Sequence, residues 1–472
     1  MKKRIKHPDV SGPQTVTPAI EVHNGQKSIQ IGFTDQKISP HAGLAAFAGF
    51  LHFHRFKGWL EKCLPERTSP NATSSADLAL GFMIGILAEC KKLAHCAHLR
   101  ADRLLPSLLG IRRFGSQSTL SRFFKDFESA RMNSLCFEGL WRWSLERLGS
   151  RPGGYTLDLD STCLLHEDAH QKEGVRSGHT PRGIKRCYHP LAGIIAEAHL
   201  VAGFWLRPGN TRSDNNSVAF TLELLKRLPS WVRLGLVRAD SGFCDERWLQ
   251  LLEAKSLPYI VVGRLHQPIQ RLIRQSTRWE STALAGTEVA EEVFQAWGWG
   301  RARRVILIRH RTAERPEAGG RLLLDCPGYT YQMLVTSLPQ QVSGLEVWRR
   351  YNGRAGSENV FKELDASFAL PQICLERFYA TEAAMSLAVL SYNLCVLFQK
   401  HVGWQERVNA ASLRMRLFTT GGVISQRGGR ATIKLAVAAG PHRDWWSRLL
   451  EKMMTPFRNC IAVEVWPQPT AY

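Results

Sequence analysis

The spacing of apolar positions predicts helices in the first third of the chain. Residues 41–150 carry apolar side chains at helical intervals, as in SADLALGFMIGILAECKKLAHCAHLRAD, which is typical of amphipathic helices. Residues 1–40 are polar and interrupted by proline and glycine, so we expect a flexible arm there. In LLGIRRFGSQSTLSRFFKDFE, a short helix, a turn and a second helix bearing Arg122 and Lys125 predict a DNA-binding helix-turn-helix. A plain helical bundle is the alternative.

After RPGG at residues 151–154 the apolar pattern becomes strand-like. Three alternating segments, then a helix, a strand, a helix and a strand, predict a mixed α/β sheet over residues 151–263. Residues 264–345 show mainly strand patterns and predict a β-rich insertion. Helical spacing returns in residues 346–400, and residues 401–472 include a segment typical of a hairpin. We expect this C-terminal region to contribute to dimerisation.

Charge narrows the class of partner. The chain has 62 Lys and Arg against 41 Asp and Glu, a net charge of +21, and such an excess attracts a polyanion such as nucleic acid. The longest apolar run, residues 383–398, is short for a membrane span of about 20 residues, so we expect a core helix, no membrane and a cytoplasmic protein.

The 11 cysteines form no C-x-x-C motif, and the spacing of Cys90, His95, Cys96 and His98 fits no standard zinc site.

Three carboxylates stand where a metal site would form. Asp158 and Asp160 are two residues apart on an expected strand and therefore share a face. Asp240 closes a second strand, and active sites of α/β sheets gather at strand ends. Glu358 lies on an expected helix. Carboxylates are the ligands that Mg²⁺ prefers, and two such ions about 4 Å apart support phosphodiester cleavage.

The helix around Glu358 has a polar stripe. At 100° per residue, the side chains of Tyr351, Arg354, Glu358 and Lys362 fall within an arc of about 80°. Arg354 and Lys362 are therefore candidates for phosphate binding beside the metals. The simpler alternatives are a turn role for each Asp and a surface ion pair between Arg354 and Glu358.

Five fragments carry a family resemblance: LDLDST, KRCYHPLAG, LRPGNTRSDN, VRADSGF and YNGRAGSENVFKEL. They resemble bacterial insertion-sequence transposases of the DDE superfamily, over roughly residues 110–400. The resemblance is to the branch with a Tyr–Arg–Glu–Lys signature and a β-rich insertion before the Glu. It implies an RNase H-like catalytic domain with Asp160, Asp240 and Glu358 as ligands of two Mg²⁺ ions, for which Mn²⁺ can substitute.

The resemblance also implies a function. Such a protein would act on double-stranded DNA as a homodimer, bind the terminal inverted repeats of its element, cleave at them and transfer the strand to a target. A nuclease or resolvase of the same fold, or an inactive DNA-binding derivative, is the alternative. The signature is incomplete, because the Lys expected seven residues after the Glu is Asp365. Lys362 would replace it, and Asp158 remains an alternative to Asp160.

Two features of the expected insertion point to DNA. Basic runs cover residues 264–278 and 301–315, and we expect Arg301, Arg303 and Arg304 to bind phosphates. In the resembled branch, an aromatic residue of the insertion stacks on a flipped base, which implies such a role for Trp297 or Trp299. A solvated basic face and ordinary strand packing are the respective alternatives.

Overall fold

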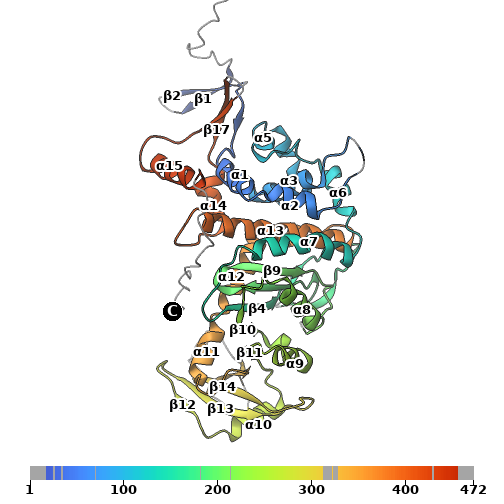
Figure 1. Ribbon diagram of the computed structural model, residues 1–472, viewed down its shortest axis with the longest axis vertical. Coiled ribbons are helices and arrows are strands. Elements are labelled where there is room, and N and C mark those ends of the chain that lie inside the picture. The colour runs from blue at the N-terminus through green and yellow to red at the C-terminus, as the bar shows by residue number, and fades with distance from the viewer. Residues whose placement is uncertain are drawn as a thin grey trace, which may run out of the picture.

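The chain forms a stack of layers in the computed structural model, with helices toward one end, a mixed sheet in the middle and further strands at the other end (Figure 1). The structure describes residues 18–24, 27–32, 34, 36–67, 69, 71–180, 182–212, 214–311, 321–322, 328–427 and 430–454.

The predicted helices of the N-terminal region are present. They are α1 (Leu44–Phe53), α2 (Phe56–Cys63), α3 (Ser75–Leu87), α4 (Leu93–Cys96), α5 (Leu105–Leu109), α6 (Gln117–Lys125) and α7 (Ala130–Leu145). Several begin at a serine that accepts a backbone hydrogen bond, and Ser116 caps α6 through the amide of Thr119. The capped starts explain where the helical pattern begins.

Helix α13 (Phe378–His401) joins the two halves of the core. Its 24 residues are long and apolar enough to cross a membrane, but the apolar window is entirely buried inside the fold. It packs against α3, α6 and α7 on the helical side and against strand β9 (Leu200–Trp205) of the sheet. One apolar cluster therefore runs from Leu44 to Leu449, and the helical region shares its core with the sheet. The expected core helix is confirmed, whereas residues 41–150 do not form a core of their own.

The central sheet has RNase H-like topology. Strands β4 (Tyr155–Ser161), β8 (Leu191–Ile195) and β9 are antiparallel, and β10 (Leu234–Ala239) and β11 (Tyr259–Val262) run parallel to β4, in the order β9-β8-β4-β10-β11. Helices α8 (Ser217–Arg227) and α9 (Glu246–Ala254) follow β9 and β10. The predicted α/β fold class is confirmed.

Side chains of α13 complete the hydrogen bonds of the sheet edge. Strand β9 has a partner on only one side. Asn393 accepts a hydrogen bond from the Val201 amide at 2.9 Å and donates one to the Val201 carbonyl at 2.8 Å. Glu382 accepts one from the Leu206 amide at 3.0 Å. Buried backbone groups require such partners, so these residues fix α13 along the edge.

The insertion continues the central sheet. Its strands are β12 (Glu280–Ser281), β13 (Thr287–Phe294), β14 (Arg303–Arg311), β15 (Arg321–Leu322) and β16 (Tyr329–Thr336), and β16 pairs with β11 to extend the sheet to ten strands. The prediction of a β-rich insertion is confirmed, but its strands do not form a separate sheet. The basic run at residues 264–278 holds a helix, α10 (Gln267–Gln275).

Smaller sheets surround this core. Strands β5 (Leu164–Leu165), β6 (Arg176–Thr180) and β7 (Gly183–Tyr188) form one of them. Strands β1 (Pro18–Asn24) and β2 (Lys27–Gly32) form a hairpin within the expected arm, while residues 1–17 lie outside the described part. Strand β3 (Ile38–Ser39) pairs with the predicted C-terminal hairpin, β17 (Gly422–Arg427) and β18 (Arg430–Leu435).

The C-terminal region also contains α14 (Ala410–Leu413) and α15 (Pro441–Met454). The role of residues 401–472 in dimerisation stays a prediction, and residues 455–472 lie outside the described part.

Candidate active site

The register of β4 and β10 sets the acidic residues side by side. The two strands are parallel, and Asp158 lies opposite Arg238. Two residues further along, the same register places Asp160 beside Asp240, just beyond the end of β10. Helix α12 (Ala355–Ser367) carries Glu358 in its first turn. Three elements that are far apart in the sequence therefore place Asp160 and Asp240 side by side and Glu358 in the same region of the fold.

Asp160 is the buried member of this group. Only 7% of it is exposed, and its Oδ1 accepts a hydrogen bond from the Ser161 amide at 2.9 Å. Burial raises its pKa to about 6; Arg354 opposes the rise, and the nearby carboxylates of Asp240 and Glu358 add to it. Asp240 and Glu358 are therefore close enough to Asp160 to influence its ionisation.

Asp240 and Glu358 are more accessible. Asp240 is partly buried, and its side chain accepts the Gly242 amide at 2.8 Å, which fixes the turn after β10. Glu358 is exposed. Within the described contacts no hydrogen bond holds its carboxylate, so this side chain can rotate toward the other two.

Arg354 and Tyr351 line the buried side of the site. They stand where α11 (Gly344–Asn352) ends and α12 begins. The guanidinium of Arg354 is 2.6 Å from Asp160 Oδ1 and only 7% of the residue is exposed. Tyr351 is also buried, and burial raises the pKa of its hydroxyl to about 12. The alternative of a surface ion pair between Arg354 and Glu358 does not hold, because Arg354 pairs with Asp160 instead.

Asp158 has a different environment from Asp160. It is fully buried and is held by a bidentate ion pair with Arg238, at 2.6 Å from Nε and 2.8 Å from Nη2. Ser357 of α12 donates a third hydrogen bond to it at 2.6 Å. Because both its oxygens are occupied by Arg238 and Ser357, Asp158 has a structural role. Metal binding by Asp160 stays a prediction.

Lys362 and Asp365 lie further along α12. Lys362 is exposed and makes no ion pair with any described residue. Asp365, where the resemblance leads one to expect Lys, is partly buried. Its Oδ1 has no hydrogen-bond partner among the described residues, and burial raises its pKa to about 6. Either Lys362 therefore takes the place of the signature Lys, or this chain lacks that Lys.

Two of the three arginines of the insertion that we expect to bind phosphates pair with acidic side chains of the protein itself. Arg303 is 4% exposed and pairs with Glu246 at 2.5 Å and with Glu253 at 2.8 Å, both on α9. Arg304 pairs with Glu291 at 2.6 Å and donates to three backbone carbonyls, those of Leu338, Pro339 and Val342. The structure contradicts the expectation that Arg303 and Arg304 bind phosphates, because their nitrogen donors are already used.

Arg301 and a second set of arginines are accessible. The side chain of Arg301 is 60% exposed, although it lies 2.9 Å from Glu253. On and around α10, Arg264, Arg271 and Arg278 are exposed and make no ion pair with any described residue. The basic run at residues 264–278 therefore presents several exposed arginine side chains on the described part of the insertion.

The two tryptophans of the insertion differ. Trp297 lies between β13 and β14 and is 100% exposed. Trp299 is half-buried against Phe294, and the guanidinium of Arg303 lies 4.9 Å from its ring centre. Strand packing explains Trp299, so the expected stacking role stays a prediction for Trp297 alone.

Arg122 and Lys125 lie on the exposed face of α6. The opposite face of this helix buries Leu120, Phe123 and Phe124. Lys125 is 3.2 Å from Glu376, and Arg122 reaches back to the Ser118 carbonyl at 3.4 Å. A DNA-reading role of α6 remains a prediction.

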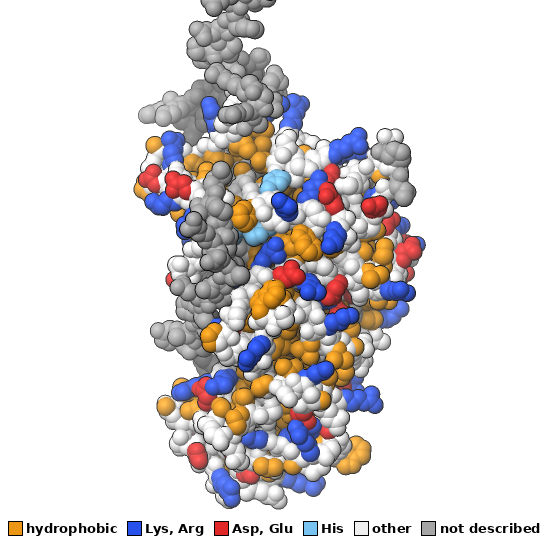
Figure 2. Space-filling view, in the orientation of Figure 1, with side chains coloured by type: hydrophobic (Ala, Val, Ile, Leu, Met, Phe, Trp, Pro, Cys, Tyr) orange, Lys and Arg blue, Asp and Glu red, His pale blue; other side chains and the backbone are white. Residues whose placement is uncertain are grey.

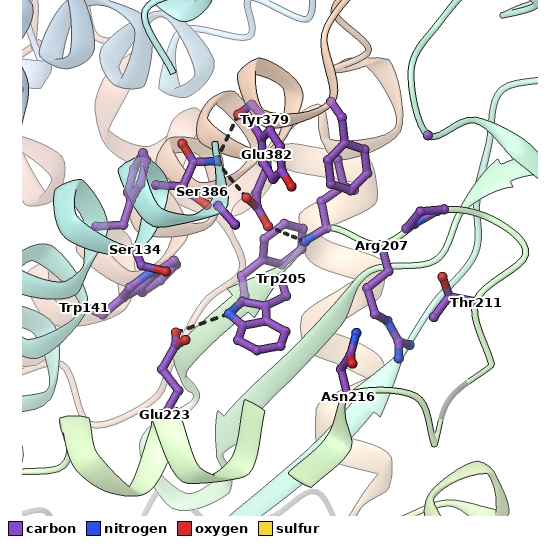
Figure 3. Close-up of a pocket in the computed structure, with 18 of the residues that line it drawn as sticks. Ser134, Trp141, Trp205, Arg207, Thr211, Asn216, Glu223, Tyr379, Glu382 and Ser386 are labelled. Atoms are coloured by element: carbon purple, nitrogen blue, oxygen red, sulfur yellow. Dashed lines mark hydrogen bonds between the residues drawn. The ribbon is translucent and has the colours of Figure 1, made fainter. Parts of the chain in front are cut away.

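None of the three carboxylates lines a large cavity in the described part of the fold. It has a volume of about 610 Å³ and is bounded by α7, β9, α8 and the start of α13 (Figure 3). Asn133 donates to Glu382 at 2.7 Å and Trp205 donates to Glu223 at 3.2 Å. Burial raises the pKa of Glu382 to about 7, although the hydrogen bonds of Asn133 and Leu206 oppose it. Because its polar groups fix α13 and β9, we assign this region a structural role.

The donor chemistry of the site suits hard divalent cations. All three carboxylates offer oxygen ligands, which hard divalent cations prefer. Among the described residues, no three His, Cys, Asp or Glu side chains are close enough together to hold a metal ion as they stand. Metal binding by the three carboxylates would therefore require the exposed side chain of Glu358 to rotate toward Asp160. It would also require Asp160 to contact the metal and Arg354 at the same time.

A comparison with models of protein families identifies the family of the chain. The family model described as "Transposase DDE domain group 1" matches residues 22–455. The chain therefore belongs to this DDE transposase family. No curated protein sequence matches it. Among solved structures, it is similar to the piggyBac transposase in a synaptic complex with hairpin DNA, with 13% identity, a TM-score of 0.42 and coverage of 82% of this chain and 83% of that one.

Proposed function

We propose that this transposase cleaves DNA at the terminal inverted repeats of its own element and transfers the freed strand to a target, using two Mg²⁺ ions. The observation that carries the proposal is the register of β4 and β10, which places Asp160 beside Asp240 under the helix that bears Glu358. Mn²⁺ is expected to substitute, because it accepts the same oxygen ligands.

Asp160, Asp240 and Glu358 would hold the two ions. Bound there, the ions would lower the pKa of a water and stabilise the charge on the leaving 3′ oxygen. Hydrolysis breaks the phosphodiester bond and leaves a 3′ hydroxyl. That hydroxyl then attacks a phosphorus atom of the second strand or of target DNA and releases another 3′ oxygen, so no covalent bond to the protein is needed.

The remaining residues would hold DNA against the carboxylates. Arg354 offers a fork of donors that fits a phosphate once Asp160 is bound to metal. Lys362, one turn after Glu358, adds a positive charge on the exposed side of α12. Arg264, Arg271 and Arg278 would contact the backbone, and Trp297 would stack on an unpaired base.

The rest of the surface is suited to a long polyanion. Lys and Arg side chains are spread along the whole length of the visible face (Figure 2). We propose that α6, with Arg122 and Lys125, contributes to recognition of the repeat, and that two copies act together in a synaptic complex.

The test is a cleavage assay with a labelled DNA fragment that carries the end of the element. With Mg²⁺ we expect a nick at the end and, with target DNA added, joined products. Without Mg²⁺, or with Glu358→Gln, we expect binding but no cleavage. Cleavage without joined products would favour a nuclease or resolvase. Metal-independent binding with no cleavage under any condition would favour an inactive derivative, as the Asp365 substitution in the signature would suggest.

A further inference from the structure

The guanidinium of Arg238 joins the elements that carry the three carboxylates. It lies at the end of β10, two residues before Asp240. Its Nε and Nη2 bind both oxygens of Asp158 on β4, at 2.6 and 2.8 Å. Its third nitrogen, Nη1, donates to the carbonyl of Arg350 in the last turn of α11. One side chain is thus bonded to β4 and α11 from its place on β10.

Helix α12 is attached to the same ion pair. Ser357 donates to Asp158 Oδ2 at 2.6 Å and is 1% exposed, and it directly precedes Glu358. The joint between α11 and α12 is shaped around Arg238 as well. A Cβ added at Gly353 would lie 2.6 Å from Arg238 Nη1, so only glycine allows the joint to pass this close.

We infer that Arg238 is a positioning residue for the transposition reaction, and that its ion pair with Asp158 sets the spacing of the metal-binding carboxylates. This inference rests on the proposed function of Asp160, Asp240 and Glu358. The ion pair and the carboxylate pair are neighbouring steps of one register, and two residues of a strand span about 6.6 Å. A fork that binds both oxygens of a carboxylate resists sliding and rotation, which a single contact does not.

The charges explain why the pair of Arg238 with Asp158 needs no ligand, whereas the pair of Asp240 with Asp160 can bind one. Where Arg238 lies opposite Asp158, the two charges neutralise each other, so the two strands are held together there without any ligand. At the neighbouring pair, Asp160 and Asp240 are both acidic, and two adjacent carboxylates repel. The ion pair between Arg238 and Asp158 therefore fixes the distance between the strands at Asp160 and Asp240, where cations would bind. Ser357 fixes the start of α12, the helix that carries Glu358.

The test is Arg238→Lys, which keeps the positive charge but removes the fork. Purified protein is unfolded by heat over a series of Mg²⁺ concentrations, because a ligand that binds the folded state raises Tm. We expect a folded protein whose Tm rise requires about tenfold more Mg²⁺ than that of the wild type, in line with the effect of removing groups that orient metal ligands. The Mg²⁺ concentration for half-maximal cleavage should shift by a similar factor.

Arg227→Lys is the matched control. Arg227 is also a buried arginine; its Nε lies 3.0 Å from Glu138 and it pairs with Glu223, and among the described contacts no hydrogen bond or ion pair joins it to Asp160, Asp240 or Glu358. It should lower Tm at every Mg²⁺ concentration without changing the Mg²⁺ requirement. If Arg238→Lys behaves in the same way, Arg238 is only structural and the inference is overturned.

If Arg238→Lys does not fold, Ser357→Ala provides a second test of the inference. It removes one hydrogen bond to Asp158 and leaves the ion pair, and we expect a smaller increase in the Mg²⁺ requirement in the same direction. An unchanged requirement would count against the inference. A wild-type protein whose Tm does not respond to Mg²⁺ and which cleaves no DNA would instead defeat the proposed function, so the two failures are distinguishable.

Discussion

Asparagine substitutions of Asp158 and Asp160 should have opposite effects on stability, although the two residues are two positions apart on one strand. Asp158→Asn leaves Arg238 buried without its partner charge, and removing one member of a buried ion pair costs about 3–5 kcal/mol. Asp160→Asn removes a carboxylate that the fold disfavours in its charged form. In metal-free protein at pH 8 we therefore expect the first variant to be less stable than the wild type and the second to be more stable.

The magnitude for Asp160 follows from its pKa, which rises from 3.8 to about 6, chiefly through burial. That rise corresponds to about 3 kcal/mol, and it already includes the attraction of Arg354. A raised pKa means that the folded state holds the proton more tightly. The stability from this proton is complete below pH 3.8 and is lost as the pH rises through about 6. The advantage of Asp160→Asn should therefore be largest at pH 8 and nearly absent at pH 4.

The assay is urea unfolding followed by tryptophan fluorescence, with EDTA present, at pH 4 and at pH 8. Asp160→Asn should also lose the increase in Tm that Mg²⁺ gives the wild type. An Asp160→Asn protein as unstable as Asp158→Asn at pH 8 would refute the assignment of the two residues. An advantage that persists unchanged at pH 4 would refute its electrostatic cause.

Three further predictions follow from the described contacts. Trp297→Ala should weaken binding to DNA with an unpaired base by about 1–3 kcal/mol and leave Tm unchanged, whereas Trp299→Ala should lower Tm, as competition binding and thermal unfolding would show. Arg271→Ala should reduce the salt dependence of DNA affinity by about one unit in log–log slope, while Arg303→Ala should cost about 3–5 kcal/mol of stability and leave the slope unchanged. Glu382, whose pKa burial raises to about 7, should make the wild type lose stability as the pH rises from 4.5 through 7, and Glu382→Gln should abolish that dependence in urea unfolding at several pH values.

The sequence predicts the local elements of the sheet well, because each strand and helix carries its own apolar period. VRADSGF gives β10 and the turn at Asp240, and SVAFTLELLKRL gives α8. It does not predict that β16 pairs with β11, since that pairing joins residues 260 and 336, and nothing local specifies it. The insertion was therefore expected as a unit of its own.

The candidate site was predictable in its carboxylates but not in their partners. The spacing of Asp158 and Asp160 shows only that both face the same side. Arg238, which decides between them, is 80 residues away from Asp158. The signal available was that Arg238–Ala–Asp240 repeats the two-residue spacing of Asp158–Leu–Asp160, so parallel strands in register would pair the first members and the second members.

The basic runs were misread for a similar reason. A strand hides every second side chain, and the acidic partners of Arg303 come from α9, about 50 residues earlier. Composition alone therefore cannot separate a buried ion pair from a phosphate contact. In α10 the helix exposes its arginines, and their contact with DNA phosphates stays a prediction.

The most direct test of the account is the position of metal in crystals of the protein with its DNA end, soaked with Mn²⁺ and located by anomalous scattering. We predict peaks bounded by the carboxylates of Asp160, Asp240 and Glu358, with Asp158 still bound to Arg238. Metal bound elsewhere, or ligated by Asp158, would contradict the account.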